Sequence, residues 1–158
     1  MNLKFQSERW PEVVEELKPM LALHWAEVAN HREAVPLDPD WDGYARLDRD
    51  GVLMITTVRA DGRLVGYYTS FVTPHPHYKS TLYGFVDVYF LLPQFRKGPA
   101  GISLFLEMEC SMRARMKAEG RKSMVLIGRG RLAHDPRKLL VRLGWTAAET
   151  AYTKLLEA

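Results

Sequence analysis

One stretch of the sequence, residues 86–103, constrains the fold more than any other, because an apolar strand, a basic glycine turn and a helix start follow one another there without a break. The strand reads VDVYFLL, and the turn after it contains Arg96, Lys97 and Gly98. Backbone N–H groups at such a junction lack intrahelical partners, so they can bind an anion together. Glycine lets the backbone approach a ligand closely, and the basic pair adds positive charge. The stretch therefore predicts a phosphate-binding turn between a strand and a helix.

Composition limits the class of protein. The 158 residues are 47% hydrophobic and 26% charged, which suits one globular domain over residues 1–158. The single cysteine, Cys110, excludes an intramolecular disulfide and fits a reducing compartment. We find no early signal peptide and no apolar run of about 18 residues that would span a bilayer. We therefore expect a cytoplasmic protein with no membrane partner.

The charge distribution favours a phosphate-bearing ligand. The net charge is +3, and the basic residues gather in residues 113–122 and 128–138. A positive field of this kind suits a cofactor, a nucleotide or a nucleic acid. A nucleic-acid-binding module is the less favoured of these, because the basic half lacks the alternation of basic and aromatic residues that makes a stacking surface.

The first half of the chain changes from a helical period to a period of two. Residues 8–30 predict two helices with a break at Pro19, and Asp38 or Asp40 can cap a short third helix. Strands are predicted over residues 52–59, 63–73 and 82–92. The turn Ala60-Asp61-Gly62 joins the first two as a hairpin, and residues 73–80 predict a loop.

The second half predicts a helix from Ile102 to Gly120, a buried strand over residues 123–127, a helix from Pro136 to Leu143 and a final strand over residues 150–156. The predicted order is α-α-β-β-β-α-β-α-β, which is the order of an α/β fold.

The glycine turn differs from the common phosphate loops. The P-loop pattern and the Rossmann pattern Gly-x-Gly-x-x-Gly are both absent. Here the turn follows an antiparallel hairpin and is led by Pro93-x-x-Arg96, with Gly101 two residues after Pro99. This arrangement resembles motif A of the GNAT (general N-acetyltransferase) superfamily of acyl-CoA-dependent N-acyltransferases, in which a strand, Pro-x-x-Arg/Gln-x-x-Gly-x-Gly/Ala and a helix follow one another.

The resemblance covers the chain from about Val52 to its last residue. It implies a single GNAT-like domain whose mixed, mainly antiparallel sheet carries N-terminal helices and two later helices. A weaker resemblance is to the compact GNAT proteins of bacteriophages. Pro99 departs from the motif, because it stands where the middle glycine usually falls.

The resemblance implies acetyl-CoA (coenzyme A) as the cofactor. The residues expected to contact its diphosphate are Arg96, Lys97, Gly98, Ala100, Gly101, Ile102 and Ser103. Phe90, Leu91 and Leu92 match the strand that pairs with the pantetheine amides. Pro99 has no N–H to offer, so one amide of the usual set is missing. The alternative for these residues is an ordinary strand-to-helix turn with a solvated Arg-Lys pair.

Asp87 is the candidate general base. Acyl transfer to a protonated amine requires a proton acceptor, and the resemblance implies a carboxylate just before the cofactor strand. Asp87 lies in an otherwise apolar strand, where burial would raise its pKa and suit it to accept a proton. The alternative is that Asp87 pairs with an arginine or caps a backbone gap.

The general acid is a departure from the family pattern. The resemblance expects a tyrosine four residues before Gly144-Trp145, where this chain has Leu140. His134 is the candidate substitute, because imidazole titrates close to neutral pH. Alternatively, His134 and Asp135 cap the helix that Pro136 begins.

His75, His77, Tyr78 and Trp41 are the candidate residues of the acceptor pocket, because the resemblance places the connection between the central strands on the acceptor side. Two histidines one residue apart can hold a metal, but no cysteine or Glu-x-x-His pattern accompanies them, so we predict no metal. A stiff surface loop is the alternative for this segment.

The leading hypothesis is an acetyl-CoA-dependent N-acetyltransferase that transfers the acetyl group directly to a primary amine of a small molecule or a protein. A GNAT-fold protein that binds acyl-CoA with little catalysis is the alternative, which Pro99 and Leu140 would permit. The apolar first helices could support a homodimer. The sequence leaves the identity of the amine open.

Overall fold

The computed structural model describes residues 2–29, 31, 33–128, 136–151 and 154–156. It divides into two compact units, Met1–Ile127 and Gly128–Ala158. The elements are β1 (Leu3–Glu8), α1 (Trp10–Val28), α2 (Trp41–Arg49), β2 (Leu53–Ala60), β3 (Arg63–His75), β4 (Tyr78–Leu91), the 3-10 turn η1 (Pro93–Phe95), α3 (Ala100–Ala118), β5 (Ser123–Ile127) and, in the second unit, α4 (Arg137–Arg142).

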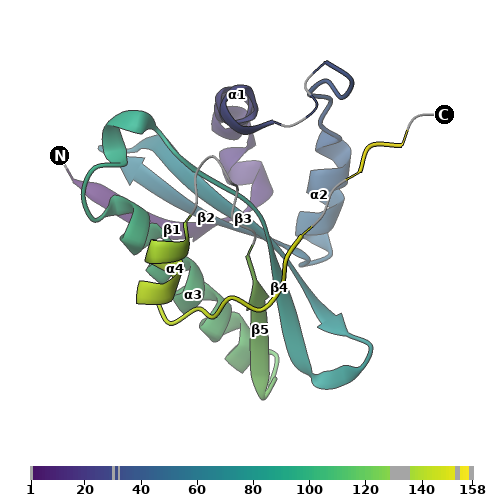
Figure 1. Cartoon of the computed structure of the whole chain (residues 1–158). Coiled ribbons are helices and arrows are strands. Elements are labelled where there is room, and N and C mark those ends of the chain that lie inside the picture. Colours follow the sequence, from purple (N-terminus) through teal and green to yellow (C-terminus); the bar gives the residue numbers. More distant parts are fainter. Residues whose placement is uncertain (1, 30, 32, 129–135, 152–153, 157–158) are drawn as a thin grey trace. The chain divides into compact units, whose positions relative to one another are not determined.

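The first unit is built on one five-stranded sheet in the order β1-β2-β3-β4-β5. The first four strands are antiparallel to their neighbours, and β5 runs parallel to β4. Helices α1 and α2 cover one face of the sheet and α3 covers the other (Figure 1). The predicted α/β class with a mixed, mainly antiparallel sheet is confirmed.

Helix α1 places a continuous apolar stripe on the sheet. Its buried residues are Trp10, Val13, Leu17, Met20 and His24. The predicted break at Pro19 is wrong, because α1 continues through it. An interior proline costs a helix roughly 3 kcal/mol, and burial of the stripe on both sides of Pro19 offsets that cost. The stripe packs within the chain, and the homodimer stays a prediction.

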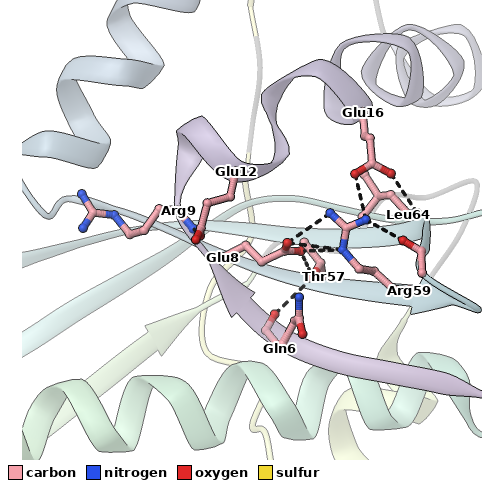
Figure 2. Close-up of polar contacts among 9 residues, drawn as sticks. Gln6, Glu8, Arg9, Glu12, Glu16, Thr57, Arg59 and Leu64 are labelled. Atoms are coloured by element: carbon pink, nitrogen blue, oxygen red, sulfur yellow. Dashed lines mark hydrogen bonds and ion pairs between the residues drawn. The ribbon is translucent and has the colours of Figure 1, made fainter.

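Strand β1 was not predicted. It pairs with β2 from Leu3↔Ala60 to Glu8↔Ile55. An internal polar network ties its end to the sheet and to α1 (Figure 2): Arg59 binds Glu8 of β1 at 3.0 Å and Glu16 of α1 at 2.8 Å. Thr57 also donates to Glu8. Thr57 and Arg59 lie 49 and 51 residues from Glu8 in the sequence. No local sequence pattern therefore predicts this strand.

The predicted hairpin and helix cap are confirmed. Asp61 and Gly62 both have positive φ, 47° and 87°, as a type I′ turn requires. Asp40 caps α2 by accepting from the N–H of Gly43 at 2.7 Å.

Two other elements differ from the prediction. The predicted loop over residues 73–80 is a tight hairpin, since β3 continues to His75 and β4 begins at Tyr78. Cross-strand ring contacts, such as that of His75 with Tyr83 at 4.4 Å, stabilise the extension. In the predicted strand over residues 150–156, the residues that the structure describes are not in a strand.

No helix among the described residues is long and apolar enough to cross a bilayer. The same residues include no group of three or more His, Cys, Asp or Glu side chains that could hold a metal ion.

Candidate active site

The sheet opens along the second half of β4. Strand β5 pairs with β4 only from Thr81↔Ser123 to Phe85↔Ile127. Beyond Phe85, the pairing of β4 in the described part of the chain is with β3 alone. Leu92 donates its N–H to Val65 of β3 at 2.9 Å, so the alternation of an antiparallel pair directs the peptide groups of Leu91 and Tyr89 away from β3. We call this side of β4 beyond Phe85 the open edge; on it, the carbonyl of Leu91 accepts a bond from Nε of Arg96 at 2.7 Å.

The open edge leads directly into the predicted phosphate-binding turn. After η1, Gly98 has a φ of 114°, a conformation that favours glycine, and Pro99 occupies the N-cap position of α3. The first helical bond runs from Ser103 N–H to Pro99 at 2.9 Å. The amides of Ala100, Gly101 and Ile102 therefore have no partner within the helix.

Burial distinguishes these three amides. Ala100 is buried, whereas Gly101 and Ile102 are half-buried. A Cβ atom built on Gly101 would meet nothing within 4 Å, so there is open space beside this position. The amides of Gly101 and Ile102 are the best placed to reach an anion, and Lys97 and Gly98 are exposed beside them.

The Arg96 side chain fixes the turn in place. Its guanidinium makes two bonds to Glu27 of α1, at 2.7 and 2.6 Å. Its Nε donates to the carbonyl of Leu91 at 2.7 Å, and the group lies 5.3 Å from the centre of the Phe90 ring. Arg96 thus joins the end of α1, the end of β4 and the glycine turn, which makes it a positioning residue.

Asp87 is the extra residue of a β-bulge in β4. Thr69 pairs with Val88 and Ser70 pairs with Val86, so Asp87 has no opposite residue. A bulge bends a strand and re-aims a side chain. Asp87 consequently lies on the face covered by α1 and α2, where the Thr69 hydroxyl is 3.3 Å from its Oδ2 and 3.3 Å from the carbonyl oxygen of Val88.

The surroundings of Asp87 change its proton affinity. Desolvation by the neighbouring protein raises the pKa of Asp87 although the residue is exposed, and the hydrogen bond from Thr69 opposes the rise. Burial, and then the charge of Asp87, raise the pKa of Tyr44 to about 12. Burial also raises the pKa of Tyr67, followed by the effects of Tyr44 and Asp87. Both phenols are therefore neutral at neutral pH.

Asp87 takes part in no ion pair within the described part of the chain. The alternative in which an arginine neutralises it finds no support there. A carboxylate in this position can accept a proton and attract a cation.

A small cavity lies on the same face of the sheet. It holds about 20 Å³ of water-accessible space and is lined by Trp10, Leu17, Leu21, Trp41, Tyr44, Tyr67, Thr69 and Val88. Trp41, one of the predicted acceptor residues, stacks with Trp10 at 6.1 Å. Behind Tyr67, its hydroxyl and Nδ1 of the buried His24 are 2.8 Å apart.

The other predicted acceptor residues lie on the β3–β4 hairpin. His75 and His77 are 5.4 Å apart between ring centres, and His75 and Tyr78 are 5.1 Å apart. The structure therefore separates Trp41, which lines the cavity, from the three hairpin residues. His134 lies outside the described residues, and Leu140 lies in α4 of the second unit.

Sequence reasoning missed Tyr44, Tyr67 and Thr69. Alternation along β3 places Tyr67 and Thr69 on one face, but no sequence motif points to them.

No family model and no curated protein matches the sequence. Solved structures do match over nearly the whole chain. A ribosomal-protein-alanine N-acetyltransferase from Brucella melitensis biovar Abortus is 21% identical, with a TM-score of 0.68 and coverage of 98% of this chain and 100% of that one. An aminoglycoside acetyltransferase from an uncultured soil metagenomic sample is 13% identical, with a TM-score of 0.74 and full coverage of both chains.

A protein from Clostridium acetobutylicum, described as a predicted acetyltransferase and solved with acetyl-CoA, is 9% identical, with a TM-score of 0.66 and coverage of 98% and 96%. At these identities the likeness establishes the fold. The chain has the GNAT fold, as the resemblance of its glycine turn implied. The bacteriophage-type resemblance stays a prediction.

Proposed function

We propose that the protein is an acetyl-CoA-dependent N-acetyltransferase that transfers the acetyl group directly to a primary amine. The observation that carries the proposal is the position of Asp87, on a bulge beside the open edge of β4 that leads into the glycine turn. The neighbours with this fold are named as acetyltransferases of a ribosomal protein and of aminoglycosides. The amine belongs to a small molecule or a protein.

The residues at the turn suit the diphosphate of coenzyme A. The amides of Gly101 and Ile102 would bind its oxygens, with Lys97, Gly98 and the Ser103 hydroxyl beside them. Along β4 the N–H of Leu91 would pair with the pantetheine arm, since the N–H of Leu92 is bonded to β3 and the carbonyl of Leu91 accepts from Arg96. Phe90 and Arg96 would support these contacts through packing.

Bound acetyl-CoA would supply a thioester whose carbonyl carbon can be attacked by an amine. Asp87 would take the proton that the protonated amine must lose, and its raised pKa makes it a stronger base than an ordinary aspartate. Thr69 would hold the carboxylate toward the acceptor.

Binding with weak catalysis is a second candidate, favoured by one observation. Leu140 stands where the family pattern expects a tyrosine that protonates the leaving thiolate. His134 stays the candidate substitute.

We propose a cytoplasmic location, where the exposed thiol of Cys110 would remain reduced.

The test has two parts. Titration calorimetry with acetyl-CoA measures binding, and chromatography of released CoA over a panel of amines measures transfer; a thiol reagent would react with Cys110 itself. We expect binding and turnover, and loss of turnover with unchanged binding in Asp87→Asn. The exposed Asp50→Asn is the matched control. Binding without turnover on any amine would favour the second candidate, and absence of binding would exclude both.

A further inference from the structure

An aromatic row runs along the β3–β4 hairpin. It consists of His75, Tyr78, Tyr83 and Phe85, with ring centres 4.4 Å apart for His75 and Tyr83, 6.0 Å for Tyr78 and Tyr83, and 6.1 Å for Tyr83 and Phe85. The rings of Tyr78 and Tyr83 are nearly parallel, at 14°. Tyr78 is 53% exposed and Phe85 38% exposed, so solvent reaches these two rings of the row. Packing of the hydrophobic core does not explain why these rings gather here.

The aromatic row ends at Asp87. Phe85 pairs directly with Phe71 of β3, and Phe71 packs against the α1 and α2 side of the core. Opposite residues of an antiparallel pair share a face, as do alternate residues of one strand. Tyr83, Phe85 and Asp87 therefore lie in line on one face. At roughly 3.3 Å per residue, Phe85 is about 7 Å and Tyr83 about 13 Å from Asp87 along the strand.

The groups around Asp87 are of a kind that suits a cation. Its carboxylate has no ion pair within the described residues, and its neighbours Tyr44, Tyr67 and Thr69 are neutral. A carboxylate that is partly desolvated needs a positive partner. Ring faces attract ammonium groups electrostatically. The aromatic row therefore also favours a positively charged ligand, at a distance from Asp87.

We infer that the acceptor is an extended aliphatic diamine or polyamine. One ammonium group binds at Asp87, which takes one of its protons; the neutral nitrogen then bonds to the acetyl carbonyl carbon as the C–S bond breaks, and its second proton ends on the CoA thiol that leaves. A second ammonium group lies over the rings of Tyr83 and Tyr78. The methylene chain between them packs along Phe85. This inference rests on the proposed acetyltransferase function and names its substrate class.

The experiment compares α,ω-diaminoalkanes of increasing length with the monoamines of equal length. The readout is kcat/KM from chromatography of the acetylated product. We expect kcat/KM to rise with length for the diamines, with a maximum when the two nitrogens are about 13 Å apart, the distance from Asp87 to Tyr83 along the strand. The monoamines should show no such maximum, since they lack the second charge.

Variants locate the second charge. Tyr78→Leu and Tyr83→Leu keep apolar bulk and remove a ring face that binds the second ammonium group, so each should reduce the preference for the diamine over its matched monoamine by about 3- to 10-fold. Leu106→Ala, at an exposed apolar residue of α3, is the control and should change nothing. Acetyl-CoA affinity should be unchanged in all three variants, which also shows that they fold.

The outcomes separate the inference from the function on which it rests. Turnover of monoamines and diamines with equal kcat/KM at every length would overturn the diamine inference and leave the acetyltransferase intact. Failure to bind acetyl-CoA would overturn the function, and the inference with it. A change of oligomeric state in Tyr78→Leu, measured by light scattering, would make the aromatic row an interface between copies of the chain and overturn its role in acceptor binding.

Discussion

Asp87 and Thr69 meet at the β-bulge of β4, where the threonine hydroxyl lies 3.3 Å from the carboxylate Oδ2. This hydrogen bond is the one side-chain bond to Asp87 that the described residues make within 3.5 Å. It offsets only part of the desolvation of the carboxylate, because the net pKa is still raised. The protein therefore keeps a destabilised carboxylate at the place where the proposed reaction needs a base.

Asp87→Asn should abolish acetylation and stabilise the fold at neutral pH. Loss of a general base lowers the rate by about 100- to 10,000-fold. Because the folded-state pKa is raised, the folded state holds the proton more tightly than the unfolded state, so stability falls as pH rises through the folded-state pKa. Urea denaturation should thus show the variant to be more stable than wild type at pH 7, with a smaller difference at pH 3. A variant less stable than wild type at pH 7 would contradict this.

Asp48→Asn should have the opposite effect on stability. Burial alone raises the pKa of Asp48, but bonds from the Arg9 guanidinium and from the N–H of Trp10, at 2.9 and 3.1 Å, together lower it. Its contribution is present above the unfolded-state pKa and is lost as pH falls through the folded-state pKa. We expect the variant to lose about 2 kcal/mol in urea denaturation at pH 7 and less at pH 3. A constant difference across that range would rule out the charge as its cause.

Gly101→Ala should separate folding from cofactor binding. The added methyl group meets no protein atom within 4 Å, and alanine favours a helix over glycine by about 1 kcal/mol. The fold should keep or gain stability while acetyl-CoA affinity falls, because the methyl group enters the space in front of the free amides. Calorimetry and thermal unfolding measure the two effects.

Gly62→Ala is the control for this prediction. Gly62 has a φ of 87° in the hairpin turn, so alanine there should lower stability and leave acetyl-CoA affinity unchanged. Unchanged affinity in Gly101→Ala would remove the first turn of α3 from the proposed binding site.

Arg96→Lys should weaken acetyl-CoA binding nearly as much as Arg96→Ala, by about tenfold. The two terminal nitrogens of the Arg96 guanidinium bond to the Glu27 carboxylate, and its Nε donates to the Leu91 carbonyl. A lysine cannot make all three bonds. Calorimetry at two salt concentrations measures the loss, with Lys4→Ala on β1 as the control. Wild-type affinity in Arg96→Lys would mean that residue 96 acts as a point charge on the phosphate instead of positioning the turn.

Several elements could be predicted because their causes are local. The turn at Asp61 and Gly62 and the cap at Asp40 each depend on residues at most three positions apart. The glycine turn at Gly98 could be predicted for the same reason. By contrast, the predicted break at Pro19 is wrong because the local cost of proline is outweighed by burial against the sheet.

The bulge could not be predicted. A strict period of two would put Asp87 and Val88 on opposite faces of β4, and nothing in VDVYFLL marks the extra residue. The shift appears only in the pairing with β3, between Thr69 and Ser70. The sequence could therefore offer Asp87 as a candidate base, which stays a prediction, but it gave no sign of the neighbours Thr69, Tyr67 and Tyr44.

The order of residues along the chain determined the strand, the glycine turn and the helix start, since each arises from backbone preferences within a few residues. It determined the resemblance to the GNAT fold in the same way. Only the tertiary structure decided that Arg96 binds Glu27, 69 residues away, and that Asp87 lies beside Thr69 and faces Tyr44. Those contacts depend on strand register and on how α1 and α2 pack across the sheet, and register is a property of paired strands that no single segment contains.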